Sequence, residues 1–338
     1  MKDNLAYAGS EGTSSTAITN NPTEAQQAEF LLDLKHGLTR QHKSISPKYF
    51  YDAAGSALFD QICDLPEYYP TRTELTILQK HAREIAVHLG PHAEILEFGA
   101  GSMQKVRILL DAMDRPARYI PIDISGEHMQ EAASKMARAY PELQVEPLVA
   151  DYTQDLVLPP DMPPDGRRVG FFPGSTLGNF EPSDALRFMR MCARTLQGGA
   201  LILGADLVKD PSRLHAAYND AQGVTADFNR NVLVRANREL GADFQLGQFA
   251  HSAFYNAPLQ RIEMHLMSTC RQVVQVDGTP FTFAQGETLH TENSYKFTVE
   301  GLQQLASRAG FTPGQVWTDH DNAFCLLWLD APTPRSHQ

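Results

Sequence analysis

Hydrophobic and polar positions change their spacing repeatedly along the chain, and the central part predicts strands that alternate with helices. The apolar residues of 93–98 predict a strand, which the tight turn Gly99-Ala100-Gly101 follows. Residues 103–113 then predict a helix, with apolar side chains on one face at Val106, Leu109, Leu110 and Met113. A strand, a glycine turn and a helix in this order form the first unit of a nucleotide-binding βαβ fold.

The same alternation continues on both sides of this unit. A capping box at Thr71 and Glu74 predicts a helix that runs to about His88. Further strands are expected at 117–124 and 144–150, in a segment running into Phe171 and Phe172, and at 200–206, with helices from Met129 to Ala139 and at 182–196. Connections of this kind give a parallel sheet. A helix at 299–309 and strands at 311–319 and 323–329 complete a pattern typical of class I methyltransferases, whose last strand is antiparallel.

The remaining segments predict a second domain. Residues 211–238 have a helical pattern, and residues 249–283 alternate as antiparallel strands around an Asp277-Gly278 hairpin turn. Residues 291–298 are expected to lead back to the final helix. We therefore expect an α/β protein with a Rossmann-like methyltransferase domain and a smaller α+β substrate-binding domain. The first comprises residues 71–207 and 295–338, the second residues 22–70 and 208–294, and residues 1–21 form a disordered tail.

The composition narrows the classes of partner. The 338-residue chain has a formal net charge of −11 at pH 7, which argues against broad binding to nucleic acid or to an anionic membrane. Its four cysteines form no CxxC pair, so we expect neither a metal site nor a disulfide framework. The sequence contains no signal-peptide core and no run of membrane-spanning length, which predicts a cytoplasmic protein. We also expect it to be a monomer.

Several residues of the predicted sheet suit a nucleotide. Gly99 and Gly101 allow a ligand to lie against the backbone, although an ordinary αβ turn also uses such glycines. Gln104 stands where the dinucleotide fingerprint has its third glycine, which argues against NAD. Asp123 ends the second strand, where an acid either binds ribose hydroxyls or caps the next helix.

Two other regions are candidates for a binding site. Residues 173–182 contain glycines, prolines and an asparagine at the carboxyl end of the fourth strand, a composition that suits close approach of a ligand to the backbone. Residues 46–56 and 65–74 are rich in tyrosine. They predict either a half-buried surface or a lid that supplies phenol groups to a small polar substrate.

Together these stretches resemble the histidine Nα-methyltransferase family of ergothioneine biosynthesis. The resemblance runs in order from about Ser46 to the last strand, and its motifs are Phe50-Tyr51-Asp52-x-x-Gly55-Ser56, residues 67–74, Gly99-x-Gly101 with Lys105, residues 174–179 and Glu292-Asn293-Ser294. It implies S-adenosylmethionine as methyl donor. It also implies L-histidine as acceptor, methylated three times on its α-amine to hercynine. The sequence departs from the family's usual residues at Phe98 and Ala100 in the glycine turn, and at Asn293 in the Glu292-Asn293-Ser294 motif.

The resemblance also implies the residues of the site. Positions that match the donor site are Gly99, Gly101, Lys105, Asp123 for the ribose, and Asp151 with Tyr152 near the adenine. Positions that match the acceptor site are Tyr51, Tyr68, Gly174, Asn179, Tyr218, Met264, Glu292 and Ser294. Within the acceptor site, the resemblance implies that Asn179 and Tyr218 hold the carboxylate of histidine, and that Glu292 and Ser294 hold its imidazole.

Methyl transfer of this kind needs alignment of an unprotonated amine about 3 Å from the methyl group, and no metal. Tyr51 and Asn179 are the candidates for orienting the amine and passing its proton to water. Without the resemblance, Glu292 would be interpreted as a surface carboxylate. The alternatives are an N-methyltransferase for another amine, such as a tryptophan or histidine derivative, a nicotinamide-dependent dehydrogenase, and a non-catalytic S-adenosylmethionine-binding module.

Overall fold

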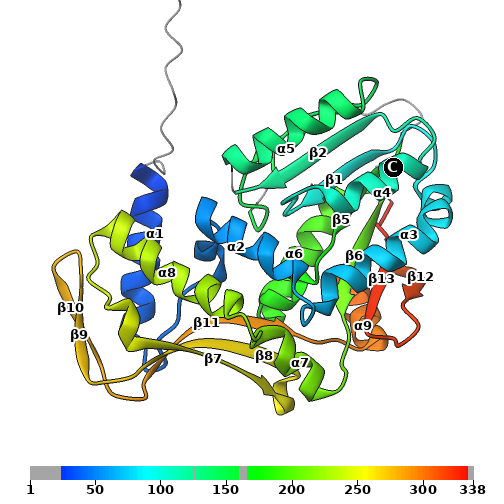
Figure 1. The fold of residues 1–338 in the computed structure, drawn as a ribbon. Helices are drawn as coiled ribbons and strands as arrows, with labels where there is room; N and C mark the ends of the chain where they lie inside the picture. The colour runs from blue at the N-terminus through cyan, green and yellow to red at the C-terminus, as the bar shows by residue number, and fades with distance from the viewer. Residues whose placement is uncertain (1–23, 125, 155, 160–165, 334–338) are drawn as a thin grey trace, which may run out of the picture.

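The computed structural model describes residues 24–124, 126–154, 156–159 and 166–333. The predicted tail at residues 1–21 lies outside these ranges. Two sheets dominate the described chain, a large one and a small one that lies beneath helices α1, α2 and α8 in Figure 1.

The large sheet has the strand order β12-β13-β6-β5-β1-β2-β3, with β4 also paired to β2. All pairs among the strands β1 to β6 are parallel, whereas β13 is antiparallel to both of its neighbours, β6 and β12. This confirms the predicted class I arrangement. The bounds are β1 Glu94–Phe98, β2 Arg118–Asp123, β3 Gln144–Val145, β4 Leu148–Val149, β5 Arg168–Phe172, β6 Ala200–Asp206, β12 Thr312–Thr318 and β13 Phe324–Asp330.

Helices cover both faces of the large sheet (Figure 1). One apolar core joins it to α3 Tyr69–Leu89, α4 Gln104–Ala112 and α5 Gly126–Ala139, and a second joins its other face to α6 Pro182–Thr195 and α9 Val299–Ala309. Alternate residues of β1 enter the two cores, since Ile95 packs in the first and Leu96 in the second. The sheet is therefore buried on both sides, as parallel sheets are.

Two predictions about this region were wrong. The helix α3 begins at Tyr69, so Thr71 lies inside its first turn and the predicted capping box does not form. Glu74 instead points its buried carboxylate at Lys105 and at the backbone N–H of Gly174. The expected third strand is two short strands, β3 and β4, because Pro147 between them has no N–H to donate to a ladder.

The small sheet is antiparallel, with the order β11-β8-β7. A third apolar core packs it against helices α1, α2, α7 and α8. Asp277 and Gly278 have φ angles of 46° and 69° and close the predicted hairpin between β9 and β10, which is thereby confirmed. The bounds are α1 Glu24–Thr39, α2 Ala53–Asp64, α7 Pro211–Tyr218, α8 Val224–Leu240, β7 Phe249–Asn256, β8 Arg261–Ser268, β9 Gln272–Val276, β10 Thr279–Phe283 and β11 Thr288–Tyr295, with short 3₁₀ turns η1 Pro47–Phe50, η2 Thr176–Asn179, η3 Leu246–Gln248 and η4 Ala257–Leu259.

Strand β11 was not predicted, and it contains a bulge. His290 pairs with His265 of β8, but the register shifts after it, so that Glu292 pairs with Met264. A bulge interrupts the alternation of faces, and therefore His290 and Glu292, two positions apart, face opposite sides of the sheet. Ser294, which pairs with Ile262, faces the same side as Glu292.

The small sheet belongs to an insertion between β6 and α9 whose two ends meet. Leu207 and Phe297 form a parallel bridge. The N–H of Phe297 donates to the carbonyl of Asp206 at 3.0 Å, and the N–H of Val208 donates to the carbonyl of Phe297 at 2.9 Å. The side chains of Asp206 and Lys296 form an ion pair at 2.8 Å beside these bonds. The division into two domains at the expected residue boundaries stays a prediction.

Candidate active site

A cavity of about 1060 Å³, called here the larger cavity, lies where β1, β2 and β5 end. Open α/β sheets bind ligands at this edge. The structure brings together at this cavity all of the residues predicted for the methyl donor, namely Gly99, Gly101, Lys105, Asp123, Asp151 and Tyr152.

The glycine turn presents its backbone to the larger cavity. Gly99 has a φ of 72°, and a Cβ atom there would lie 3.6 Å from the Tyr152 ring. Gly101 has a φ of 48° and open space where a Cβ atom would stand. Its N–H donates to the Asp123 carboxylate at 3.3 Å, which ties the turn to the end of β2. The turn thus offers both space and a carboxylate to a nucleoside.

Lys105 forms an ion pair with a buried carboxylate. Its Nζ lies 2.7 Å from Glu74, whose side chain is fully buried. Burial alone would lower the pKa of Lys105, but the Glu74 carboxylate outweighs this effect and the pKa is raised. Glu74 also accepts the N–H of Gly174 at 2.9 Å. Lys105 therefore helps to fix the loop after β5, a role that the sequence did not indicate.

A second, smaller cavity of about 50 Å³ adjoins the first. It is lined by all of the residues predicted for the acceptor, namely Tyr51, Tyr68, Gly174, Asn179, Tyr218, Met264, Glu292 and Ser294. Five of them also line the larger cavity, namely Tyr51, Tyr68, Gly174, Asn179 and Glu292. The two predicted sets of residues therefore surround two adjoining cavities, although their binding roles stay predictions.

The tyrosine-rich stretches divide into two groups. Tyr51 and Tyr68 line both cavities and make edge-to-face contacts with Phe59, at ring-centroid distances of 5.8 and 6.3 Å. Burial raises the pKa of both well above the usual value, so both are neutral phenols. Tyr49 and Tyr69 instead donate to carboxylates of the protein, Tyr49 to Asp33 at 2.6 Å and Tyr69 to the buried carboxylate of Asp206 at the end of β6 at 2.7 Å. Half of this tyrosine set is structural.

Glu292 and Asp206 are the acidic residues that line the smaller cavity, and within the described ranges Glu292 is the one without a paired cation. It is 8% exposed, and burial raises its pKa to about 8, although the Lys296 ammonium acts to lower it. No side-chain hydrogen bond to its carboxylate occurs among the described residues. A buried acid without an internal partner suits a ligand that brings a hydrogen-bond donor.

Ser294 and Tyr218 are in direct contact. The Tyr218 hydroxyl donates to Ser294 Oγ at 2.7 Å, so the residues expected at the carboxylate and at the imidazole share a hydrogen bond. Lys296 Nζ donates to the same Ser294 oxygen at 2.8 Å and to the Asp206 carboxylate at 2.8 Å. Sequence reasoning missed Lys296 and Asp206. The only sequence signal is that Lys296 follows Ser294 by two positions. This spacing indicates side chains on the same face of a strand, which could be used only once β11 is known to be a strand.

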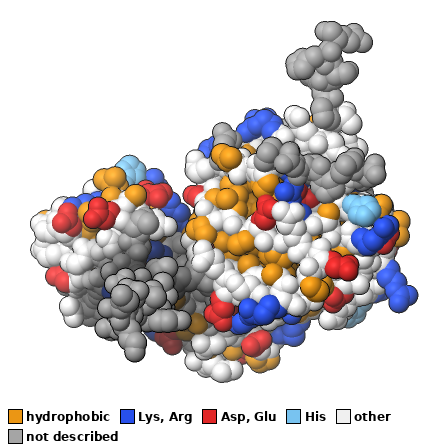
Figure 2. All heavy atoms as spheres, turned by 90° about the horizontal axis from the view of Figure 1, so that it is seen from above, with side chains coloured by type: hydrophobic (Ala, Val, Ile, Leu, Met, Phe, Trp, Pro, Cys, Tyr) orange, Lys and Arg blue, Asp and Glu red, His pale blue; other side chains and the backbone are white. Residues whose placement is uncertain are grey.

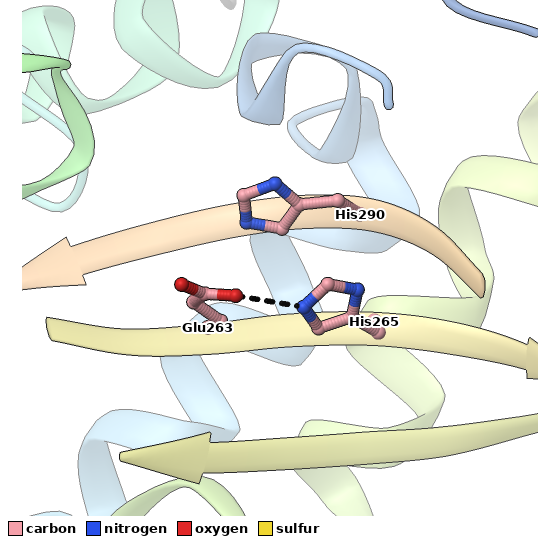
Figure 3. Close-up of side chains that lie close together, drawn as sticks. All are labelled: Glu263, His265 and His290. Carbon is pink, nitrogen blue, oxygen red and sulfur yellow. Dashed lines mark hydrogen bonds and ion pairs between the residues drawn. The ribbon is translucent and has the colours of Figure 1, made fainter. Parts of the chain in front are cut away.

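Three side chains lie close together on the face of the small sheet opposite to Glu292 (Figure 3). Glu263, His265 and His290 place a carboxylate oxygen and two ring nitrogens within 4.8 Å of one another, a donor set that zinc accepts. The Glu263 carboxylate, however, already pairs with Arg261 at 2.8 Å and with His265 at 3.2 Å. His290 Nε2 bonds to the carbonyl oxygen of Glu292 at 3.1 Å, across the bulge. Cysteine spacing does not bear on this network, so the expectation of no bound metal stays a prediction.

The molecular surface is mixed in character. Figure 2 shows hydrophobic side chains gathered on the upper face of the part formed by the large sheet, with charged groups scattered around them. None of the helices in the described part of the chain combines the length and hydrophobicity that crossing a bilayer requires. The four cysteines all lie in described segments and are free thiols, with Cys192 and Cys325 buried.

The parallel sheet with its antiparallel last strand, the glycine turn and the adjoining cavity define a class I methyltransferase. The model of the family described as "Histidine-specific methyltransferase, SAM-dependent" matches residues 30–331. The "Histidine N-alpha-methyltransferase" of Mycolicibacterium smegmatis is 44% identical over 300 residues, which cover 87% of this chain and 92% of that protein. The chain belongs to the histidine-specific, S-adenosylmethionine-dependent methyltransferase family.

Two more distant likenesses accompany this result. The "Ergothioneine biosynthesis protein 1" of Neurospora crassa is 29% identical over 288 residues, which cover 79% of this chain and 31% of that protein. The crystal structure of a Burkholderia thailandensis 1,6-didemethyltoxoflavin-N1-methyltransferase, with its substrate and S-adenosylhomocysteine bound, covers 82% of this chain and 88% of its own. Its identity is 13% and its TM-score 0.42, values that bear on no detail of the site. The family confirms the predicted enzyme class and methyl donor.

Proposed function

We propose that this enzyme transfers three methyl groups to the α-amine of L-histidine and so forms hercynine for ergothioneine biosynthesis. The observation that carries the proposal is the shared space beside the glycine turn, which Glu292 and Asn179 both line. Membership of the histidine-specific family, and the name of the mycobacterial relative, support it.

The larger cavity fits S-adenosylmethionine by the character of its wall. The open backbone at Gly101 and the Asp123 carboxylate suit a ribose, and the Tyr152 ring beside Gly99 suits an adenine. Asp151 accepts hydrogen bonds from the N–H and hydroxyl of Thr153, which orients its carboxylate beside that ring. When bound, the donor supplies a methyl group whose bond to nitrogen forms as its bond to sulfur breaks.

The amine is held by Tyr51 and Asn179 in this proposal. The buried Tyr51 hydroxyl is a neutral phenol, so it orients the amine through its oxygen and does not act as a base. Within the described residues, the Asn179 side chain makes no hydrogen bond and is available to a carboxylate or an amine. The amine loses its proton to water, and the neutral nitrogen attacks. Phenol and amide oxygens also suit the cationic product.

The imidazole is bound in this proposal by Glu292 and Ser294, which both line the smaller cavity. An acceptor without a ring N–H would leave the buried Glu292 carboxylate unpaired, at a cost of about 1–3 kcal/mol. An N-methyltransferase for a tryptophan-type amine is the alternative, because an indole also has one N–H. An indole has no second ring nitrogen and so would leave Ser294 without a contact. Glu292 and Ser294 both line the smaller cavity, which favours the imidazole.

Mass spectrometry of the products tests this proposal. Purified protein is incubated with isotope-labelled S-adenosylmethionine and a panel of amino acids that includes histidine, tryptophan and ring-methylated histidines. We expect mass gains of one, two and three methyl groups on histidine alone. Equal labelling of tryptophan, or labelling of the ring instead of the α-amine, would contradict the proposal. The monomeric state and the cytoplasmic location stay predictions.

A further inference from the structure

The ammonium group of Lys296 has all of its hydrogens engaged by the protein. Its side chain is 1% exposed. Nζ lies 2.8 Å from Asp206, 2.8 Å from Ser294 Oγ and 3.2 Å from the Tyr218 hydroxyl. A lysine ammonium has three N–H donors and no acceptor, so these three contacts use its full capacity.

Ser294 Oγ consequently accepts twice. It receives one hydrogen from Lys296 at 2.8 Å and one from the Tyr218 hydroxyl at 2.7 Å. A hydroxyl oxygen has two acceptor lone pairs and one hydrogen to donate. With both lone pairs occupied, the only hydrogen bond that Ser294 can still make is as a donor, and it lines the same smaller cavity as Glu292.

We propose that Lys296 is a specificity-determining residue, which makes Ser294 a donor only and thereby selects the neutral imidazole ring of the acceptor. The inference rests on the proposed function and deepens it. The neutral ring has one N–H and one bare nitrogen. Its N–H donates to a Glu292 carboxyl oxygen, and its bare nitrogen accepts the Ser294 hydroxyl hydrogen.

The positive charges near the ring act in the same direction. An imidazolium has two N–H groups, and Ser294 has no lone pair left for the second one. The Lys296 ammonium is hydrogen-bonded to Ser294, the proposed partner of the ring, and its positive charge opposes a cation on that ring. Lys209 adds a second positive charge on Asp206. Glu292 is the one acidic group facing the ring from β11, and the facing Tyr51, Tyr68 and Tyr218 are phenols.

The opposite hydrogen-bond order is the alternative that the experiment must exclude. If Ser294 donated to Tyr218, its oxygen would have a lone pair free, and the cavity would accept an imidazolium. A phenol is the stronger acid of the two hydroxyls and the better donor, which favours the order in which Tyr218 donates.

Nitrogen NMR of bound histidine distinguishes the two orders. Histidine labelled with ¹⁵N at both ring positions is bound to excess enzyme that is loaded with S-adenosylhomocysteine, over a range of pH around 7. We expect one protonated and one unprotonated ring nitrogen, held down to a pH well below the titration of free histidine. Two protonated nitrogens in the wild-type complex would overturn the inference while leaving the proposed function intact. Absence of histidine binding by calorimetry would instead contradict the proposed function.

Substitution of Lys296 provides the second arm. Lys296→Met removes its hydrogens but leaves Asp206 paired with Lys209 and Tyr69. We expect bound histidine to titrate at a higher pH in this variant, with both nitrogens protonated near neutrality. Lys209→Met is the matched control, because Lys209 binds the same carboxylate without contacting Ser294 or Tyr218, and it should raise the titration much less than Lys296→Met does. If Lys296→Met does not fold, Tyr218→Phe frees the other lone pair and should raise the titration in the same direction. An unchanged spectrum in a folded variant of either kind would refute the role of Lys296.

Discussion

Glu292 shows how one buried carboxyl group links ligand recognition to stability. Its folded pKa is about 8, against an ordinary value of 4.5, because burial favours the neutral form. Between these two values the unfolded chain has lost the proton that the folded protein keeps. Folding therefore takes up a proton, and the stability of the ligand-free protein falls as the pH rises from about 4.5 to about 8.

The first residue-scale prediction concerns the pH dependence of stability. Glu292→Gln removes the titrating group, so the melting temperature of the ligand-free variant should decline less between pH 6 and pH 9 than that of the wild type. The same variant should bind histidine roughly tenfold to a hundredfold more weakly, since an amide replaces the carboxyl group that accepts the ring N–H. Calorimetric melting at several pH values and titration calorimetry measure the two effects. A parallel decline in both proteins would show that Glu292 is ionised in the folded state.

At the scale of secondary-structure elements, Glu74 joins three parts of the large sheet region. It lies on α3, pairs with Lys105 of α4, and accepts the N–H of Gly174 in the loop after β5. That loop leads into η2, which ends at Asn179. A single buried carboxylate thus fixes two helices relative to a loop that lines both cavities.

Removal of this carboxylate should destabilise the protein. Glu74→Ala leaves the half-buried Lys105 ammonium and a backbone N–H without their partner, and we expect a loss of about 3 kcal/mol in the free energy of unfolding. Glu84→Ala is the matched control on the same helix, because Glu84 is 49% exposed and pairs only with His81 among the salt bridges of the described chain. Its loss should be below about 1 kcal/mol. Urea unfolding of both variants measures the difference, and equal losses would contradict the role of Glu74.

Regular elements were predictable to the extent that their apolar spacing was regular. The strand at Ala200–Asp206 and the helix at Val299–Ala309 have the predicted bounds, because a continuous apolar run and a clear helical spacing mark them. Strand β11 has neither signal. Its polar side chains face a cavity, and the bulge after His290 breaks the alternation by which a strand is detected.

Individual site residues show the same limit. The resemblance identified residues that line the two cavities, yet it could not show that Tyr218 contacts Ser294 or that Lys296 binds both. Lys296 is separated from Asp206 by the whole insertion, and their ion pair depends on how its two ends meet. A local sequence pattern contains no information on such a contact.

At the scale of the whole molecule, Asp206 joins the two sheets. It ends β6 of the large sheet, and its carboxylate, 1% exposed, binds Lys296, Lys209 and the Tyr69 hydroxyl. Burial alone would raise its pKa, but the two lysines outweigh that effect and the pKa is lowered. A depressed pKa contributes stability above the ordinary value of 3.8, and this contribution is lost as the pH falls through the lower folded value.

The prediction at this scale is a change in acid unfolding. Asp206→Asn leaves two lysines without their buried counter-charge and should lower the free energy of unfolding at pH 7 by about 3–5 kcal/mol. The variant should also lose less of its remaining stability on acidification below pH 4. Asp184→Asn is the control, because Asp184 is 47% exposed and its pairing with Arg187 is a surface contact. Acid titration followed by circular dichroism compares them, and an unchanged acid transition in Asp206→Asn would be inconsistent with this assignment.

The meeting of the two ends of the insertion at Asp206 and Phe297 has a consequence for how such enzymes diversify. Because the chain departs from and returns to the same point of the large sheet, the length of the insertion is independent of the strand order of that sheet. Met264 and Glu292, which line the smaller cavity, belong to this insertion, whereas the glycine turn does not. Substitutions in the insertion can therefore reshape the acceptor pocket without altering the turn beside the methyl donor.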